Sequence, residues 1–180
     1  GVEPFIEQLA APTAAPGGGS ASAAAGAMAA GLAAMVAGMS RGKKAYVQYE
    51  TQHSEALARL ATLREQLKAA IDADSEAYKG VVAAFKAARD NPAAESQVNA
   101  ATRTATLVPL GVAEKAREVA TIVEQLKPIT NPKMVTDLTV AASFARTAIE
   151  GAIANVEINL EGFDDPAFVS EIRSKVAKLK

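Results

Sequence analysis

The chain contains no cysteine and no tryptophan, and it has a single histidine among its 180 residues. Without cysteine it can form no disulfide, no thiolate nucleophile and no zinc–thiolate site, and one histidine cannot build a histidine-rich metal centre. Aromatic residues make up only 4% of the sequence. The regular alternation of apolar and polar residues that is typical of half-buried β-strands is also missing. These absences exclude a disulfide-stapled domain and several classes of catalytic site.

The sequence has 19 Lys and Arg residues and 20 Asp and Glu residues, so neither sign of charge is in excess. The net charge of −1 gives no reason to expect a nucleic acid or an anionic membrane as a partner. The N-terminus shows no basic stretch followed by an apolar run and a cleavage site, so we expect a cytoplasmic protein.

Residues 8–40 carry no charge at all, and this stretch is long enough to span a bilayer. Its first third is rich in Pro and Gly, and the remainder consists mostly of Ala, Gly and Ser. A membrane span is therefore the weaker interpretation, and a helix buried in a protein core is the better one.

Apolar residues recur every three or four positions over most of the chain, which is the periodicity of packed helices. The length suits one domain with a substantial core, and we expect a single domain over residues 1–180. We predict an all-α bundle of long antiparallel helices with a buried Ala/Gly-rich helix. The predicted helices cover about residues 3–10, 20–40, 44–89, 93–127, 132–161 and 166–178, with a turn at 90–92.

Three consecutive glycines, Gly17, Gly18 and Gly19, precede Ser20 and the uncharged helix. Glycines let a backbone approach a ligand closely, and Ser20 is a suitable helix N-cap. The first turn of a helix presents free N–H groups and the positive end of the helix dipole. The pattern therefore predicts a binding site for an anion or for the polar edge of a heterocycle.

Small residues recur at four-residue steps inside the uncharged helix, at Gly26, Ala30, Ala34 and Gly38. They form a smooth ridge on which another helix can approach closely. Gly31 is a further glycine in this helix, and each internal glycine costs about 0.5–1 kcal/mol relative to alanine. We expect close helix contacts to offset that cost.

Asp74 is the best candidate for chemistry, because it interrupts an apolar stripe on the helix at 44–89. A carboxylate in such a position suits proton transfer, or else it is bonded to a neighbouring helix. Asp72 lies off the stripe and reads as a solvated charge, and His53 on the stripe reads as a core histidine rather than an acid or base. The spacing of three or four throughout this stripe predicts the seam of one long packed helix. The stripe consists of Tyr46, Tyr49, His53, Leu57, Leu60, Leu63, Leu67, Ile71, Asp74, Tyr78, Val81 and Phe85.

Five other polar residues have both a structural and a functional interpretation. Lys43 and Lys44 follow a helix end, where they either compensate the helix dipole or bind a substrate carboxylate. Asp137 either favours the N-terminal half of its helix or binds the donor-rich edge of a heterocycle. Asn155 and Asn159 are one turn apart in a helix, where Asn is unfavourable, so they bond to another helix or to a ligand.

Six short motifs, taken in order, resemble the folate cyclodeaminase/cyclohydrolase family, which includes the cyclodeaminase part of formiminotransferase-cyclodeaminase and standalone bacterial proteins. The resemblance covers about residues 4–166. One departure is Thr130-Asn131-Pro132-Lys133, where the family usually has Gly-Asn-x-Asn. The motifs are PGGGS at 16–20, GKKxY at 42–46, IDADSxAY at 71–78, VPL at 108–110, Asn131 with Thr136-Asp137, and GAxxNVxIN at 151–159.

The resemblance implies a homodimer that binds a tetrahydrofolate derivative and uses no metal or redox cofactor. The first expectation is cyclisation of 5-formiminotetrahydrofolate to 5,10-methenyltetrahydrofolate with release of ammonia, and a separate formiminotransferase is a candidate partner. The alternatives are a methenyltetrahydrofolate cyclohydrolase, an enzyme for another cyclic amidine and a non-catalytic helical assembly protein.

The resemblance also implies roles for the candidate residues. Asp74, assisted by Asp72, is expected to be the general acid/base at the N5–C–N10 bridge, and Lys43 is expected to bind the substrate tail or assist proton transfer. Among the expected substrate-binding residues, Lys44 binds the tail and Asp137 holds the pterin. Asn155 and Asn159 fix either the helix packing or the substrate. The backbone around the ligand is that of Gly17, Gly18, Gly19 and Ser20.

Overall fold

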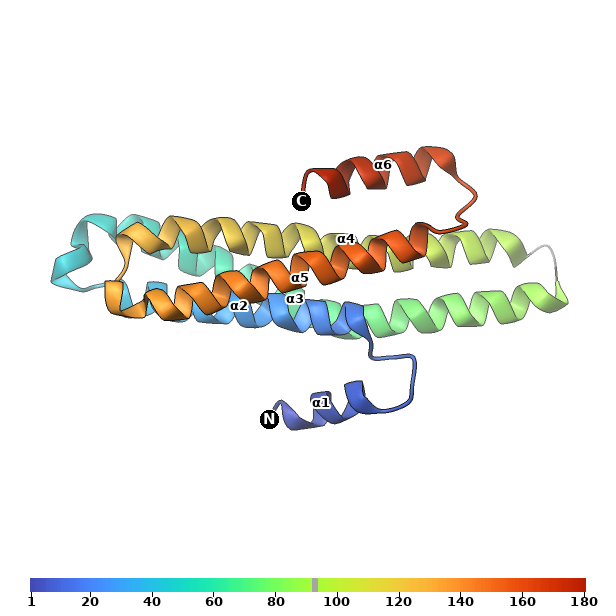
Figure 1. Cartoon of the computed structure of the whole chain (residues 1–180), viewed down its shortest axis with the longest axis horizontal. Helices are drawn as coiled ribbons and strands as arrows, with labels where there is room; N and C mark the ends of the chain where they lie inside the picture. The colour runs from blue at the N-terminus through green and yellow to red at the C-terminus, as the bar shows by residue number, and fades with distance from the viewer. Residues whose placement is uncertain (92–93) are drawn as a thin grey trace.

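A computed structural model describes residues 1–91 and 94–180, and this part of the chain contains helices and connecting segments but no β-strand (Figure 1). The all-α prediction is confirmed. The predicted helices match to within three residues with one exception: the helix predicted from residue 44 begins only at Glu50, because residues 44–49 form a separate 3-10 helix. The predicted turn at 90–92 lies partly outside the described residues. The α-helices are α1 Glu3–Ala10, α2 Gly18–Ser40, α3 Glu50–Asp90, α4 Glu95–Leu126, α5 Val135–Leu160 and α6 Pro166–Ala177, and the short 3-10 helices are η1 Lys44–Tyr49, η3 Lys127–Ile129 and η4 Pro132–Met134.

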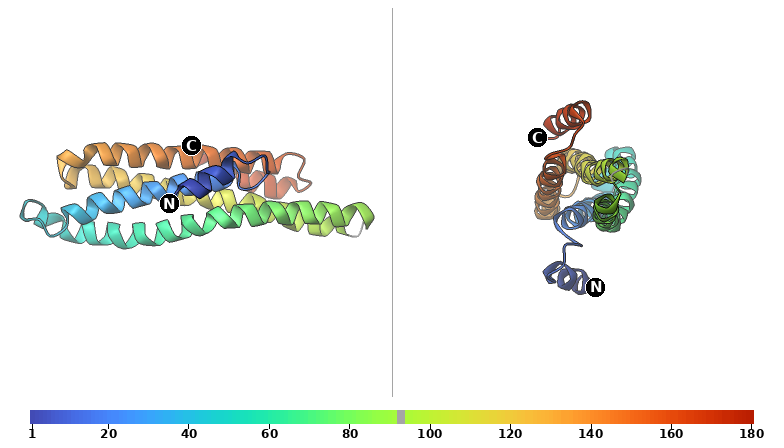
Figure 2. Two further views of the ribbon diagram at one scale, coloured as in Figure 1. Left: turned by 90° about the horizontal axis from the view of Figure 1, so that it is seen from below. Right: turned by 90° about the vertical axis from the view of Figure 1, so that its right-hand side faces the viewer.

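Helices α2, α3, α4 and α5 form an elongated antiparallel bundle, in which α2 packs against the other three (Figure 1). At one end α3 and α4 continue as a pair beyond α2 and α5 (Figure 1, right). The terminal helices α1 and α6 lie outside the four-helix bundle, α1 on the side of α2 (Figure 2). The bundle therefore has a middle of four helices and an extension of only two.

The small residues of α2 allow its neighbours to approach closely. Ala30 is fully buried, and a Cβ added to Gly26 would lie 3.1 Å from Leu67 Cδ2 on α3 and 3.5 Å from Ala148 Cβ on α5. Of the predicted ridge, these two positions are confirmed as close contacts, whereas Gly38 is exposed. Although α2 is long and apolar enough to count as a candidate membrane span, 56% of its most apolar window is buried inside the bundle. Its packing supports the prediction of a core helix.

The apolar stripe on α3 is buried over its first half only. His53, Leu60 and Leu67 are completely buried, but Tyr78 is 43% exposed and Phe85 is 55% exposed. The prediction of one continuous packed seam is therefore wrong beyond Asp74. The reason is that α2 begins at Gly18, beside Asp74, and leaves the rest of α3 uncovered on that side.

Two helices are capped by polar side chains, and a glycine lies just after the end of another. Asn131 Oδ1 accepts from the Lys133 amide at 3.0 Å and caps η4, and Asp165 Oδ1 accepts from the Phe168 amide at 3.0 Å and caps α6. Gly42 has a φ of 70°, as expected for a glycine that ends a helix. The predicted N-cap role of Ser20 is wrong, because α2 begins earlier and its N-cap is Gly17.

Candidate functional site

The carboxylate of Asp74 lies against the first turn of α2. Ser20 Oγ is 2.9 Å from Asp74 Oδ2 and 2.9 Å from the carbonyl oxygen of Ile71, so its single proton is donated to one of them at a time. Ser75 Oγ is 3.3 Å from the same hydroxyl. Asp74 is only half-buried, and the described residues offer its Oδ1 no hydrogen-bond donor. The carboxylate is thus both bonded to a neighbouring helix and open on one side.

The glycine run is what allows this contact. A Cβ on Gly19 would lie 2.6 Å from Asp74 Cγ and closer still to Oδ1, so no larger residue fits without displacing the carboxylate. A Cβ on Gly18 would lie 3.3 Å from Asn155 Nδ2 on α5. The first amide that donates within α2 is that of Ala21, to the Gly17 carbonyl at 3.0 Å. The amides before it have no acceptor within the helix, and they lie at the positive end of the helix dipole, where a negative charge is stabilised.

A cleft of about 360 Å³ opens beside this carboxylate, and we refer to it as the Asp74 cleft. Asp74 carries the only charge among the residues that line it. At Val81, Ile158 and Asn159 the cleft continues into a second groove of about 590 Å³ along the α3–α4 extension. The lining residues are Ala14, Ala15, Gly17, Gly18, Gly19, Asp74, Ala77, Tyr78, Val81, Ala105, Asn155, Ile158 and Asn159.

Both asparagines of α5 line this cleft. The prediction of a bond to another helix is confirmed for Asn159 but is wrong for Asn155, which bonds within α5 itself. Asn159 Nδ2 donates to the Ala105 carbonyl of α4 at 2.8 Å, and Asn155 Nδ2 donates to the Gly151 carbonyl at 2.8 Å. Because each amide nitrogen is engaged in this way, each amide oxygen remains as an acceptor beside the cleft. The two residues therefore combine a packing role with a polar lining.

Tyr78 and Ile158 are lining residues that sequence reasoning did not assign to the site. The signal for Tyr78 was its spacing, since it lies one turn after Asp74 on α3 and shares its face. No local signal pointed to Ile158 or to Ala105, because their part in the cleft depends on how α4 and α5 cross α3.

The structure does not bring the other candidates to this cleft. Asp72 is exposed, as a solvated charge would be, and lines a separate hollow of about 250 Å³ with Phe5 and Pro16. Lys43 and Lys44 are exposed beyond the opposite end of α2, whose 23 residues measure about 34 Å. Asp137 lies in the first turn of α5, at the same far end.

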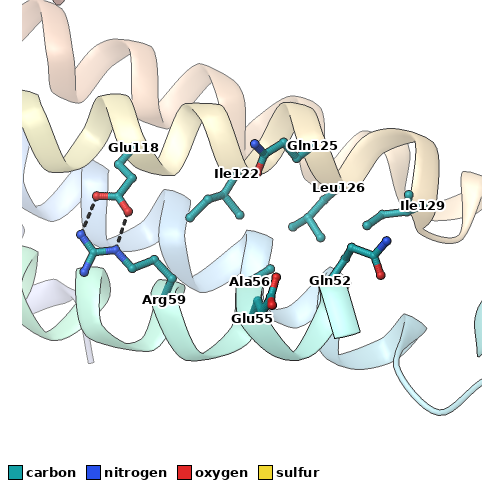
Figure 3. Close-up of a pocket in the computed structure, with 9 residues that line it drawn as sticks. All are labelled: Gln52, Glu55, Ala56, Arg59, Glu118, Ile122, Gln125, Leu126 and Ile129. Carbon is teal, nitrogen blue, oxygen red and sulfur yellow. Dashed lines mark hydrogen bonds and ion pairs between the residues drawn. The ribbon is translucent and has the colours of Figure 1, made fainter. Parts of the chain in front are cut away.

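A different hollow, of about 480 Å³, lies between α3 and α4 and is crossed by an ion pair of Arg59 and Glu118 (Figure 3). The Arg59 Nη2 to Glu118 Oε2 distance is 2.6 Å, and hydrogen bonding to Arg59 lowers the pKa of Glu118. We refer to it as the Arg59–Glu118 hollow. Nearby, the buried His53 has its Nε2 3.0 Å from the Ile129 carbonyl oxygen, which supports its interpretation as a core histidine.

Comparisons with known proteins agree with this fold. A crystal structure of formiminotetrahydrofolate cyclodeaminase from Thermotoga maritima superposes with a TM-score of 0.93 and 27% identity, over 99% of this chain and 87% of that one. A methenyltetrahydrofolate cyclohydrolase of Methylorubrum extorquens is 34% identical over 72% of this chain and 64% of its own length.

A formimidoyltransferase-cyclodeaminase of Sus scrofa is 31% identical over 77% of this chain. That match spans 27% of the pig protein, and the match to the Methylorubrum cyclohydrolase spans 64% of that protein. The chain therefore covers less than two thirds of the length of each of these two relatives. The family model of formiminotransferase-cyclodeaminase matches residues 1–178. Since this match extends over nearly the whole sequence, the chain belongs to the formiminotransferase-cyclodeaminase family.

Proposed function

We propose that this chain catalyses cyclisation of 5-formiminotetrahydrofolate to 5,10-methenyltetrahydrofolate with release of ammonia. The observation that carries the proposal is the single open carboxylate of Asp74 in an otherwise uncharged cleft at a glycine-rich helix N-terminus. The family, and the cyclodeaminase activity named for its relatives, support this choice of substrate.

The proposed reaction consists of bond exchanges that one carboxylate can assist. N10 attacks the carbon of the protonated formimino group (N5–CH=NH2⁺), the C=N electron pair moves to that nitrogen, and the carbon becomes tetrahedral between N5 and N10. Asp74 accepts the proton from N10 and returns a proton to the departing nitrogen, which leaves as ammonia. The product carries a positive charge delocalised over N5, C and N10. The negative charge of Asp74 stabilises that charge in a cleft whose remaining walls are neutral.

The remaining residues of the cleft suit a reduced pterin. The amide oxygens of Asn155 and Asn159 offer hydrogen-bond acceptors to the N–H-rich edge of the ring. Tyr78 and Val81 supply an apolar wall one and two turns along α3 from Asp74. Ser20 holds one carboxylate oxygen, which leaves Oδ1 to face the reacting bridge.

Hydrolysis of 5,10-methenyltetrahydrofolate to 10-formyltetrahydrofolate is the second candidate. It is favoured by the cyclohydrolase named in Methylorubrum extorquens, which matches 72% of this chain. Water attacks the same bridge carbon and gives one proton to Asp74. The carbinol oxygen then loses its second proton and becomes the formyl carbonyl as the C–N5 bond breaks; N5 takes up one of the two protons and the other is released. Both reactions pass through a tetrahedral carbon at the same place, so one arrangement of residues can serve either.

Neither reaction changes an oxidation state, and the proposal therefore includes no redox cofactor and no metal. It includes a cytoplasmic location, in keeping with soluble folate metabolism, and a separate formiminotransferase as the source of the formimino substrate. Asp72 is given no part in the proton transfer, because it lines a different hollow.

The test follows the absorbance of methenyltetrahydrofolate with purified protein against an enzyme-free blank. A faster rise from formiminotetrahydrofolate is the expected result and establishes a cyclodeaminase. A faster fall from methenyltetrahydrofolate, without the rise, identifies a cyclohydrolase. If a folded protein accelerates neither reaction and reduced folates do not raise its melting temperature, the function is not folate chemistry and the assembly interpretation replaces it.

A further inference from the structure

A fifth hollow, of about 420 Å³, lies between α4, α5 and the residues that follow α6. Helix α6 folds back along the bundle, so the C-terminus lies over its middle (Figure 1). Two of the lining residues are Arg117 and Arg146, and we refer to it as the Arg117–Arg146 hollow. Arg146 and Asn155 of the Asp74 cleft are two and a half turns apart on α5, on opposite sides of that helix. The hollow and the cleft are therefore separate sites.

The floor of this hollow is apolar. Ile149 and Ile153 of α5 are 7% and 8% exposed, and Ala120 of α4 and Leu179 are half-buried. The volume falls in the range of about 300–1,000 Å³ that is usual for small-molecule sites, which combine apolar walls with a few polar groups. The floor is therefore suited to cover the apolar part of a small ligand.

The polar groups of this hollow include two arginines that no carboxylate neutralises. The chain has eight arginines, and two of the three without an ion pair inside residues 1–91 and 94–180, Arg117 and Arg146, line this hollow, whereas the third, Arg89, lies elsewhere. Like charges repel each other, so an anion between these two side chains is favoured. The five ion-paired arginines are Arg41, Arg59, Arg64, Arg103 and Arg173.

The cations that line the other four hollows are already neutralised. Arg59 is paired with Glu118, and Lys79 Nζ is 2.7 Å from Glu76 Oε1. The lining of the Asp74 cleft and of the groove along the α3–α4 extension includes neither lysine nor arginine. Unneutralised arginines beside an apolar floor therefore distinguish the Arg117–Arg146 hollow from these four.

Two carboxylates also border the hollow, but neither is paired with its arginines. Lys127 Nζ donates to the two oxygens of Glu124 at 2.6 and 2.8 Å. Glu150 lies one turn after Arg146, a spacing that permits an ion pair, yet none forms between them in the part of the chain that the structure describes. With Lys180 at the rim, positive charge is in excess around the hollow.

We propose that the Arg117–Arg146 hollow binds a small anion that carries an apolar group, a carboxylate or a phosphate ester on a short hydrocarbon. Guanidinium groups from two adjacent helices hold the anionic group by charge-assisted hydrogen bonds, for which the planar fork of arginine is well suited. The floor at Ile149 and Ile153 covers the hydrocarbon. This site is independent of the proposed folate reaction.

Four probes separate the contribution of charge from that of the apolar floor. They are hexanoate, hexyl phosphate, hexylammonium and inorganic phosphate, each titrated into the wild-type protein by calorimetry at low salt. Hexyl phosphate and hexanoate are expected to bind once per chain and more weakly as salt rises. Inorganic phosphate should bind at least about tenfold more weakly than hexyl phosphate, because it buries no hydrocarbon. Binding of one alkyl anion alone still supports the site and identifies its anionic group.

Two outcomes of these titrations overturn the proposal. One is the binding of neither alkyl anion. The other is hexylammonium binding as tightly as hexyl phosphate, since the arginines would then contribute nothing.

Matched arginine variants locate the site. Arg117→Gln and Arg146→Gln each remove one guanidinium from an exposed position, and each is expected to weaken hexyl phosphate binding about tenfold while circular dichroism stays unchanged. Arg89→Gln is the control, because Arg89 is also unpaired within the described residues but lies outside the hollow. Glu150→Gln should strengthen binding several-fold by removing a competing carboxylate. An equal loss in the Arg89 variant would mean general surface charge and would refute the site.

Filling the floor tests the apolar part of the proposal. Ala120→Trp adds a large side chain without a change of charge and is expected to abolish hexyl phosphate binding but not the weak binding of inorganic phosphate. If this variant does not fold, the arginine series decides. Asp74→Asn should bind hexyl phosphate like wild type, so failure of the folate reaction leaves this result intact. Arginine-dependent flotation with anionic phosphatidylglycerol vesicles, without binding of free hexyl phosphate, would assign the surface to a membrane and overturn the proposal.

Discussion

The Asp74 cleft and the Arg59–Glu118 hollow differ in what their charges do. The hollow is larger, about 480 Å³ against 360 Å³, but its two central charges neutralise each other (Figure 3). In the cleft, a carboxylate has a hydroxyl on one oxygen, a glycine backbone against it and no cation among the lining residues. Volume alone would favour the hollow, whereas the unpaired carboxylate favours the cleft.

The cleft and the hollow also differ in how strictly the neighbouring atoms fix the residue type at each position. Gly19 is required by the position of Asp74, because any side chain there would collide with the carboxylate. Arg59 and Glu118 are half-exposed partners on adjacent helices, an arrangement that contributes little to stability and that other residue pairs could replace. A substitution in the Asp74 cleft is therefore expected to have a large effect, and a matched substitution in the Arg59–Glu118 hollow a small one.

Asp74→Asn should have the largest effect on activity. The amide keeps the size of the carboxyl group and can still accept from Ser20, but it cannot take up or return a proton at the bridge carbon. We expect kcat to fall by about 10²–10⁴-fold with little change in melting temperature. The matched control is Glu118→Gln, the same chemical change in the Arg59–Glu118 hollow. Near-wild-type turnover by the Asp74 variant would remove its acid/base role.

Gly19→Ala should affect stability and activity together. The added methyl group must displace either the Asp74 carboxylate or the first turn of α2. Overpacking of this kind costs about 1–3 kcal/mol, measured as the free energy of unfolding in urea. Gly31→Ala is the control within the same helix, because its Cβ meets nothing within the chain. A Gly19 variant as stable and active as wild type would contradict the close contact between this glycine and Asp74.

Helix boundaries and the small-residue contacts of α2 could be predicted because periodicity and residue size are local properties. The contact of Ser20 with Asp74 could not, since the two residues are 54 positions apart and only the crossing of α2 and α3 joins them. For the same reason, spacing treated Tyr78 as core: it shows which residues share a face, but not where the covering helix begins. Lys43 follows the end of the predicted helix that begins at the glycine run, so the sequence already separated it from that run by one helix length. Only the structure shows that Asp74 lies at the glycine end of this helix.

Asn159→Ala should have a smaller effect that separates packing from binding. It removes the hydrogen bond to the Ala105 carbonyl and leaves that acceptor at the edge of the cleft, which costs about 1 kcal/mol of unfolding free energy. If the amide oxygen also binds the pterin, KM for the folate rises several-fold while kcat changes less. A stability loss with an unchanged KM would restrict Asn159 to helix packing.

Glu118→Gln should have the smallest effect and should depend on pH. Arg59 lowers the pKa of Glu118, so the pair stabilises the fold above the unfolded-state pKa, and this contribution is lost as pH falls through the lower folded-state value. Because both side chains are exposed by more than a third, solvent screening limits the change in Tm at pH 7 to about 3 °C. Melting curves of wild type and variant should converge below about pH 4 and in high salt. A large loss of Tm or of folate turnover in this variant would mean that the hollow, and not only the Asp74 cleft, contributes to function.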